Sequence, residues 1–508
     1  MRLSLTLFGA LTSKPYAFKA RSWELKSIET IDLFDSLNSN VRLDVRGSEI
    51  MRILPINNEI INEEWISDKA RYAFDGLKRE RFINPMIKKN NIFVQATWKE
   101  AFQYINEQVT ARKSNNFVIN TSNFTDIEHI VALNTFSTRI QSKFKPSINA
   151  NKEINADLQE YYTIKPDFFT FKGQKVILLV GINLRLENPV LNIKLKRLST
   201  LNNVLVGYIG SKNNYNLNCE HLGNNISVLN DIISGKHKFC AVISNFLKKN
   251  SKNQKIANSF KNSISILFGN EFTQYKNAAN IIRTLKSIKN PFFTFDYNVL
   301  KLSSGEINML ELGFFNKIKI NKNENTIFYL LNTETLENYK NGDFVIFQGD
   351  HNTALRSYFD VILPNVNWTE KSSLYLNCFG FIQKTQFGIL PPINCRDDWK
   401  ITYMILNTIL NQNIKQTSPS STQLQNIHHL VNTFSPNLMN FINKYKTKNK
   451  QGINLTYSNN TKINIKTTKM PFKSFISNYY QMSSIEKASK VMTACSQSFV
   501  AKKLNFSK

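Results

Sequence analysis

Short, mostly apolar runs recur through the middle of the chain, and each ends in a glycine or a polar turn. Runs with so little alternation are typical of strands that are covered on both faces, as in a parallel sheet. Amphipathic stretches such as Ala278–Ile288, with apolar residues at helical spacing, supply the crossovers. The pattern predicts an α/β fold of mostly parallel sheets flanked by helices. The runs are Val176–Val180, Val204–Ile209, Ile264–Phe268, Ile327–Leu331, Phe344–Phe347 and Val361–Leu363.

The N-terminal part of the chain follows a different pattern. Residues 26–60 alternate polar and apolar positions around a turn at Gly47, which predicts a small, half-buried β-region. Ser67 and Asp68 have side chains suited to cap a helix, and Trp98–Val109 has the spacing of another amphipathic helix. The apolar faces of these two helices comprise Ala70, Ala73 and Leu77 in the first, and Trp98, Ala101, Ile105 and Val109 in the second.

The C-terminal part is more polar and less regular. It contains a linker at Ser418–Thr422, a turn at Phe434–Leu438 and an irregular polar stretch at Asn449–Lys469. A last helix is predicted over Ser483–Cys495, because Ile485, Ala488, Val491 and Met492 fall on one side of it.

A chain of 508 residues is too long for one simple core, so several packed units are expected. We divide it into a connector (1–25), a small β-rich subdomain with a helix (26–90), the α/β domain (91–400) and a helical or irregular C-terminal region (401–508). Hydrophobic content of 42% argues against disorder. No apolar run is longer than Val176–Val180, which is far shorter than the roughly 20 residues that span a bilayer.

The formal net charge of +28 raises the possibility of a polyanion ligand. The lysines are nevertheless scattered and accompany asparagine, as in residues 88–91 and 321–325. Lys and Asn share A-rich codons, so an A+T-rich genome, such as an organellar one, produces this pattern without selection for binding. Codon bias is the favoured interpretation, and docking onto acidic partner proteins or a nucleic-acid site remain as alternatives.

The cysteines are few and widely spaced, and none forms Cys-x-x-Cys. Such a set is typical of free thiols in a reducing compartment. Cys219-x-His221 has residue types that bind metals but no second pair at zinc-finger spacing. The adjacent His428 and His429 would point about 100° apart on a helix, so they are poorly placed to share a metal. The five cysteines are Cys219, Cys240, Cys378, Cys395 and Cys495.

The segment Asn62–Leu77, Asn-Glu-Glu-Trp-Ile-Ser-Asp-Lys-Ala-Arg-Tyr-Ala-Phe-Asp-Gly-Leu, resembles the part of molybdopterin oxidoreductases that follows an iron–sulfur cluster. Ser67 stands at the cysteine position of that motif and Ala70 at a glycine position. This version, with Trp65 and Asp75, is similar to the large iron–sulfur (NuoG-type) subunit of respiratory complex I. In that family the molybdopterin-type domain persists without its cofactor.

The resemblance extends to Gly9–Thr12, which in the family follows a Cys-Pro-Val triplet with a cluster ligand. Thr6, Leu7 and Phe8 occupy those positions here. The resemblance therefore implies a split subunit, in which a separate polypeptide carries the ferredoxin-like clusters and this chain carries no cofactor. An alternative for the basic N-terminus, which has no acid before Glu24, is a mitochondrial presequence.

The stretch Val180–Pro189 is similar to the loop that binds a pterin-dinucleotide phosphate in molybdoenzymes. A vestigial anion site is one interpretation of it, and a strand-to-helix turn with Glu187 near the helix N-terminus is the favoured one. Leu184 replaces the first proline of the family motif. The family-like residues that remain are Gly181, Asn183, Arg185, Glu187 and Pro189.

A second family-like region includes Glu370-Lys371-Ser372 and continues to Gln383. Phe379 and Phe381 stand where the family has Glu and Arg, which indicates packing, and Cys378 is interpreted as a buried free thiol. His351 has no evident nucleophile partner. The stretch Glu220-His221-Leu222-Gly223 resembles Asp-His-Leu-Gly of the family, and this resemblance implies a structural role for His221. The chain has no Gly-x-Gly-x-x-Gly, Gly-x-Ser-x-Gly, P-loop or His-Glu-x-x-His motif.

We therefore assign no catalytic, cofactor-binding or metal-ligating residue. The resemblance implies a non-catalytic, structural part of the peripheral arm of NADH:ubiquinone oxidoreductase, on the matrix side of the mitochondrial inner membrane. Its expected partners are the cluster-bearing fragment and the flavin- and NADH-binding subunit, with no nucleic acid and no transmembrane segment. Two alternatives remain: an active molybdopterin-dependent oxidoreductase similar to formate dehydrogenase, and a basic nucleic-acid-binding protein.

Overall fold

The structure is a computed structural model of the whole chain. It describes residues 13–506 with these exceptions: 113–116, 143–158, 170–175, 202–203, 213–214, 252–262, 274, 276–277, 288–293, 314–325, 334–335, 337–338, 341, 411–426, 432–470, 473 and 475. The expected linker at 418–422, the turn at 434–438 and the irregular stretch at 449–469 lie outside the described residues.

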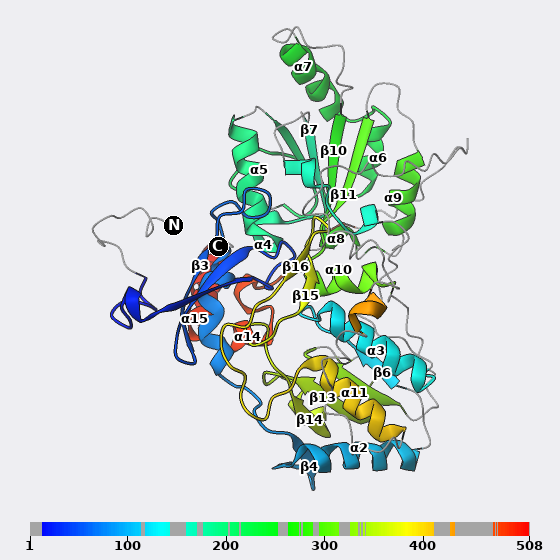
Figure 1. Cartoon of the computed structure of the whole chain (residues 1–508). Coiled ribbons are helices and arrows are strands. Elements are labelled where there is room, and N and C mark those ends of the chain that lie inside the picture. The colour runs from blue at the N-terminus through cyan, green and yellow to red at the C-terminus, as the bar shows by residue number, and fades with distance from the viewer. Residues whose placement is uncertain are drawn as a thin grey trace.

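Two parallel-rich sheets and two small antiparallel sheets organise the described chain (Figure 1). The smallest pairs β15 (Leu374–Leu376) with β16 (Ile382–Lys384). In that view the five-stranded sheet lies at the top and the six-stranded sheet at the bottom. The small N-terminal sheet lies at the left, beside the C-terminal helices α14 (Ser484–Ala488) and α15 (Lys490–Phe506). The small N-terminal sheet and α14 therefore share a core, to which α14 contributes Ile485.

The five-stranded sheet is parallel throughout and has the order β11-β10-β7-β8-β9. Its central strand, β7, is the apolar run Val176–Val180, and all five of its side chains are buried. Burial on both faces explains why the run shows no alternation. The other strands are β8 (Leu205–Ile209), β9 (Glu220–Gly223), β10 (Ser263–Phe268) and β11 (Thr294–Val299).

Helices follow the strands of the five-stranded sheet along the chain, and the last of them, α10, contacts β15 and the helix Ile127–Arg139. They are α4 (Leu184–Glu187), α5 (Pro189–Leu201), α6 (Ser227–Ile233), α7 (Phe239–Ser251), α8 (Asn270–Thr273), α9 (Ala278–Ser287) and α10 (Ser304–Glu311). Helix α9 confirms the amphipathic stretch predicted at Ala278–Ile288, with Ile281, Ile282 and Leu285 buried.

The six-stranded sheet has the order β5-β4-β14-β13-β12-β6. Its last four strands run parallel, and β4 and β5 add an antiparallel hairpin to its edge. Helices α2 (Trp98–Arg112), α3 (Ile127–Arg139) and α11 (Asp398–Ile409) accompany it. The strands are β4 (Met86–Lys89), β5 (Ile92–Gln95), β6 (Phe117–Asn120), β12 (Ile327–Leu331), β13 (Phe344–Gly349) and β14 (Val361–Pro364).

The six apolar runs all form buried parallel strands, which confirms the predicted α/β class. The alternating N-terminal region forms the antiparallel strands β1 (Lys26–Ile31), β2 (Asn40–Arg46) and β3 (Glu49–Pro55). The pattern missed β6, β9 and β11 and the β4–β5 hairpin. The division into four units stays a proposal; helix α11 runs across the boundary expected after residue 400.

The predicted cap at Ser67 is confirmed, because its hydroxyl accepts a hydrogen bond from Ala70 N (3.1 Å) at the start of α1 (Asp68–Tyr72). A 3-10 turn, η3 (Ala73–Lys78), continues from α1. The predicted helix Ser483–Cys495 is two helices, α14 and α15, which break at the extended residue Ser489. No helix of the described residues is long and apolar enough to cross a membrane.

Candidate functional site: a buried charge network at the edge of the six-stranded sheet

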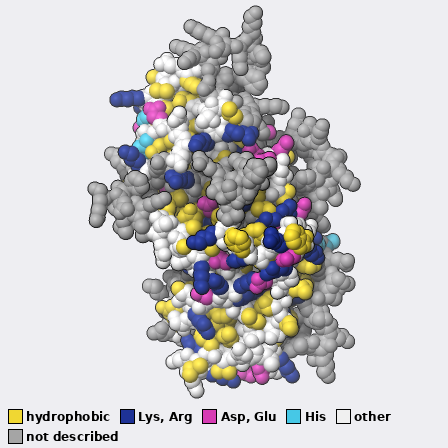
Figure 2. Space-filling model, turned by 90° about the vertical axis from the view of Figure 1, so that its left-hand side faces the viewer, with side chains coloured by type: hydrophobic (Ala, Val, Ile, Leu, Met, Phe, Trp, Pro, Cys, Tyr) yellow, Lys and Arg dark blue, Asp and Glu magenta, His cyan; other side chains and the backbone are white. Residues whose placement is uncertain are grey.

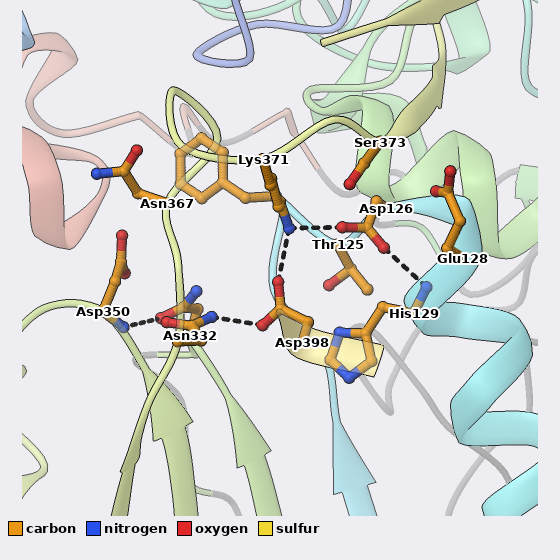
Figure 3. A network of polar contacts seen from close by, with 12 residues as sticks. Thr125, Asp126, Glu128, His129, Asn332, Asp350, Asn367, Lys371, Ser373 and Asp398 are labelled. Carbon is orange, nitrogen blue, oxygen red and sulfur yellow. Dashed lines mark hydrogen bonds and ion pairs between the residues drawn. The ribbon is translucent and has the colours of Figure 1, made fainter. Parts of the chain in front are cut away.

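The parallel strands of the six-stranded sheet end at a common edge, which is where open α/β sheets bind ligands. The segments that follow β6, β12, β13 and β14 bring polar side chains to this edge (Figure 3). They include Asp126 after β6, Asn332 after β12, Asp350 after β13 and Lys371 after β14. The edge is therefore the natural place to look for a cofactor or catalytic site.

Lys371 is the central cation of the network. Its ammonium group donates to one carboxylate oxygen of Asp126 and to Oδ2 of Asp398 (2.6 Å), and all three side chains are buried. Burial alone would lower the pKa of Lys371, but the two carboxylates raise it well above its usual value. Lys371 is therefore held as a cation between two anions.

Asp398 is anchored by further donors besides Lys371. Its Oδ1 accepts from Gln348 Nε2 (3.0 Å) and from the Asn365 amide. Burial opposes the charged form, but Lys371 and these hydrogen bonds lower the pKa of Asp398 to about 2. Asp126 in turn caps α3 by accepting from His129 N (2.7 Å). Asp126 thus both pairs with Lys371 and caps α3, and Asp398 both pairs with Lys371 and accepts from Gln348 and Asn365.

The network continues through neutral side chains to the sheet. His129 Nε2 lies 3.1 Å from the Thr402 hydroxyl, which lies 3.1 Å from the Tyr329 hydroxyl. Tyr329 also donates to Gln348. Burial lowers the pKa of His129 and so favours its neutral imidazole. Most donors and acceptors of this group pair with one another, although Asn365 Oδ1 is buried without a hydrogen-bond partner among the described residues.

A second ion pair closes the other side of the edge. The guanidinium of Arg81 binds both carboxylate oxygens of Glu370, and Glu370 Oε2 also accepts from Asn367 N (3.1 Å). His351 lies between Asp350 and the carbonyl oxygen of Gly76, 3.0 Å from each. His351, after β13, and Glu370, after β14, thus bind the segment around Gly76 and Arg81.

The cavity that the described residues leave beside this network is small. The cavity beside Asp350 and Lys371 has a volume of about 20 Å³ and is also lined by Trp368 and by Ile485 of α14. That volume accommodates on the order of one water molecule. A pterin dinucleotide cannot enter without displacing the ion pairs or the C-terminal helix. Side chains and the C-terminal helix of this chain thus occupy the edge at which such sheets bind ligands, and we call it a filled cofactor edge.

The corresponding edge of the five-stranded sheet contains the family-like loop Val180–Pro189. There Glu187 Oε1 accepts from Asn183 N (2.8 Å), and Oε2 accepts from Asn270 N (3.2 Å). Two backbone donors of the kind that bind phosphates thus bind a carboxylate of the chain itself. These contacts account for the loop as a strand-to-helix turn, which was the favoured interpretation.

The C-terminal part of the chain covers this second edge. Gly181 has a φ of +56°, and a Cβ there would lie 2.7 Å from Phe272 N and 2.8 Å from Cε1 of Phe472. Phe472 is buried, its backbone N–H donates to Asn224 O (3.0 Å), and its ring packs edge-on against Tyr275. Both ligand-type edges are therefore covered by segments of this chain.

The signature segment, Asn62–Leu77, lies in another buried charge cluster. Lys69 of α1 forms an ion pair with Glu486 of α14 (3.3 Å) and lies 4.4 Å from the centre of the Tyr479 ring. Asp32 and Asp35, between β1 and β2, are buried beside it, and each has one carboxylate oxygen with no hydrogen-bond partner. Burial raises the pKa of Asp35 to about 6 and that of Asp32 well above its usual value.

This cluster predicts a pH-dependent stability. Because the folded chain holds protons on Asp35 up to a higher pH than the unfolded chain does, the free energy of unfolding should fall as the pH rises from about 4 to about 6. Asp35→Asn should remove up to about 3 kcal/mol of that dependence, the equivalent of its pKa shift. Urea unfolding at pH 4.5 to 6.5 measures the slope. Asp231→Asn, on an exposed part of α6, is the control and should leave the slope unchanged.

The other residues considered from the sequence have ordinary structural surroundings. Cys378 is fully buried in the large core, and Phe379 packs edge-on against Phe169, so both fit the packing interpretation. His221 Nε2 lies 3.1 Å from Gly210 O, and His428 lies 3.6 Å from Glu128. Among the described residues no group of three or more His, Cys, Asp or Glu side chains is placed to hold a metal.

Sequence reasoning singled out Glu370-Lys371-Ser372 but missed the partners of Lys371. Asp126 and Asp398 lie 245 and 27 residues from it along the chain, so no local pattern joins them. The available signal was an acid at the start of two apolar helices, α3 and α11. An acid there normally indicates an exposed cap, which is why neither was considered as a buried ion-pair partner.

The chain matches two protein-family models. Residues 81–408 match the molybdopterin oxidoreductase model, which covers more than half of the chain. Residues 25–75 match the NADH-ubiquinone oxidoreductase NDSU1/NuoG-like 4Fe-4S domain. The second match corrects our cofactor prediction. The prediction that this chain has no iron–sulfur cofactor is wrong, because a 4Fe-4S domain model matches it and iron–sulfur clusters are therefore expected in it.

The side chains of the matched segment lack the ligands of such a cluster. Residues 25–75 contain no cysteine, and Ser67 is a buried hydroxyl engaged in capping α1. A hydroxyl does not replace the thiolate that holds a cluster iron. The residues of this segment do not fit the group, and we derive no electron-transfer step through them.

Relatives and solved structures resemble the chain over most of its length. The NADH-ubiquinone oxidoreductase 75 kDa subunit of Reclinomonas americana is 34% identical, over 97% of this chain and 71% of that protein. The mitochondrial NADH dehydrogenase iron-sulfur protein 1 of Solanum tuberosum is 32% identical, over 96% of this chain and 64% of that protein. Acetylene hydratase from Pelobacter acetylenicus has a TM-score of 0.47 at 11% identity, over 76% of this chain and 70% of that one. The chain therefore belongs to the molybdopterin oxidoreductase family and, within it, to the 75 kDa subunits of NADH-ubiquinone oxidoreductase.

Proposed function

We propose that this chain is a structural, non-catalytic part of the peripheral arm of mitochondrial NADH:ubiquinone oxidoreductase. The observation that carries the proposal is the filled cofactor edge: Lys371, Asp126 and Asp398 form a buried ion triad beside a cavity of about 20 Å³. An active molybdenum enzyme needs an open pocket there. A domain whose ligand edges are filled by its own side chains can instead serve as a rigid support for neighbouring subunits.

The relatives and the distribution of cysteines support a proposal about its partners. We propose that it binds a separate cluster-bearing polypeptide that supplies thiolate ligands, together with the flavin- and NADH-binding subunit. The support is that the segment matching the 4Fe-4S domain has no cysteine. A position on the matrix side of the inner membrane, and synthesis inside the mitochondrion as the Lys and Asn bias suggests, complete the proposal.

The test is native extraction of mitochondria with a mild detergent, followed by electrophoresis and in-gel NADH oxidation. We expect the chain to migrate with the NADH-oxidising band, with a cysteine-rich polypeptide and the flavin subunit at equal stoichiometry by mass spectrometry. Metal analysis of the band should find iron without molybdenum or tungsten. Recovery of the chain alone with stoichiometric molybdenum, or with ribonucleoprotein, would contradict the proposal.

The site of synthesis needs its own measurement. Labelling of new protein in intact cells should be abolished for this chain by chloramphenicol, which blocks mitochondrial ribosomes, and should persist in cycloheximide. The opposite pattern would place the gene in the nucleus and leave the structural role untouched.

A further inference from the structure

A basic groove lies on the side of the molecule formed by the N-terminal segment and the small sheet. Residues 13–24 line one wall, and Arg46, Arg52 and Arg71 contribute to the other, around a cavity of about 770 Å³. This is large enough for several side chains of another molecule. Figure 2 shows the same side of the protein, where Lys and Arg side chains alternate with hydrophobic ones across the middle of the face.

The charges of the groove are strongly one-sided. Five of its lining residues are basic, and Glu24 is the acidic one. Arg46 is paired with Glu24 (3.2 Å), and Arg52 is paired with Asp44 (2.6 Å) while its guanidinium lies 4.7 Å from the centre of the Tyr16 ring. The other basic residues, Lys19, Arg21 and Arg71, make no ion pair with any described carboxylate.

Two aromatic side chains project beside these cations. Phe18 is fully exposed and Trp23 is 79% exposed, with the Arg21 guanidinium 6.0 Å from the centre of the Trp23 ring. Phe18 also has a φ of +61°, a conformation that costs energy for a bulky residue. Exposed Trp and Phe beside Arg are typical of the residues that dominate protein–protein binding energy.

We propose that the basic groove docks an acidic segment of another subunit, with carboxylates at Lys19 and Arg71 and an apolar side chain against Phe18 and Trp23. The proposal rests on the proposed function, because it names the surface by which the chain joins its assembly. A protein fits better than a nucleic acid. Glu24 and the Asp44 carboxylate lie among the cations, and they would repel a continuous row of phosphates while leaving room for separate carboxylates.

The first experiment uses the native assembly isolated from mitochondria. Zero-length carbodiimide coupling, which joins an amine to a contacting carboxylate, should link Lys19 to an Asp or Glu of another polypeptide. Hydroxyl-radical oxidation of Phe18 and Trp23 should be at least fivefold slower in the assembly than in the recombinant full-length chain. Unchanged oxidation together with an unlinked Lys19 would overturn the docking surface, even where the chain migrates with NADH oxidation. Loss of that co-migration is instead a failure of the proposed function.

The second experiment compares matched charge reversals. The recombinant chain with Lys19→Glu and Arg71→Glu should bind the cross-linked partner at least tenfold more weakly than the unaltered chain. Lys89→Glu, in the distant β4–β5 hairpin, should change binding less than twofold. Equal thermal midpoints of the variants establish that folding is intact. Equal partner affinity of the variants, or displacement of the partner by a 20-nucleotide RNA at low salt, would refute the proposal.

Discussion

Lys371→Met is expected to lower the free energy of unfolding by about 3–5 kcal/mol, because it leaves the buried carboxylates of Asp126 and Asp398 without their shared cation. Methionine fills a similar volume, so the loss comes from electrostatics and not from a cavity. Urea unfolding followed by tryptophan fluorescence measures the change, since Trp368 and Trp399 lie within a few residues of the triad.

Two further variants separate this explanation from a general effect of losing a lysine. Lys400→Met removes a partly exposed pair with Asp397 and should cost no more than about 1 kcal/mol. Adding Asp126→Asn and Asp398→Asn to Lys371→Met should recover part of the lost stability, because neutral amides need no buried counter-ion. The electrostatic explanation is wrong if the triple variant is less stable than Lys371→Met by the sum of the free-energy losses that Asp126→Asn and Asp398→Asn each cause in the unaltered chain.

Gly76→Ala is expected to release the C-terminal helices from the N-terminal subdomain. A Cβ at Gly76 would lie 2.1 Å from the carbonyl oxygen of Ile485, so the backbone of α14 must move. The expected loss is about 3 kcal/mol or more, above the usual range for overpacking because the obstacle is backbone. Limited trypsin digestion should cut at Lys487 and Lys490 much faster than in the unaltered chain.

The matched control for this variant is Gly47→Ala. Gly47 also lies in the N-terminal subdomain and has a φ of +62°, but no atom lies within 4 Å of a Cβ there. Its cost should be about 1 kcal/mol from the left-handed backbone alone, with no change in C-terminal cleavage. Equal cleavage in both variants would mean that the tail is not held at Gly76.

Strands were predictable in this chain wherever both faces are buried and the apolar run is uninterrupted, as in β7 and β12. Strand β11, Thr-Phe-Asp-Tyr-Asn-Val, was missed because it lies at a sheet edge and alternates with polar residues. The short β9, Glu220–Gly223, lacks any apolar run. Edge strands need fewer apolar side chains, so their sequences approach those of loops.

The candidate site shows the limit of the same reasoning. The resemblance at Glu370-Lys371-Ser372 identified the correct segment, yet the function of Lys371 depends on Asp126 and Asp398, which tertiary structure alone brings to it. Ser67 was predictable as a helix cap from its local sequence, because a cap involves neighbouring residues only. Charge pairing across a sheet edge has no such local signature.

The contact of the signature segment with the C-terminal helices has a consequence for how the chain is made. Lys69 and Asp75 bind residues 413 to 416 positions further along the sequence. The N-terminal subdomain therefore cannot complete its core until α14, which contributes Ile485 to it, has left the ribosome. During that interval the partly formed sheet exposes apolar surface, which is the state that aggregates most readily. If a ribosome stalls before residue 484, the N-terminal subdomain of the nascent chain has an incomplete core.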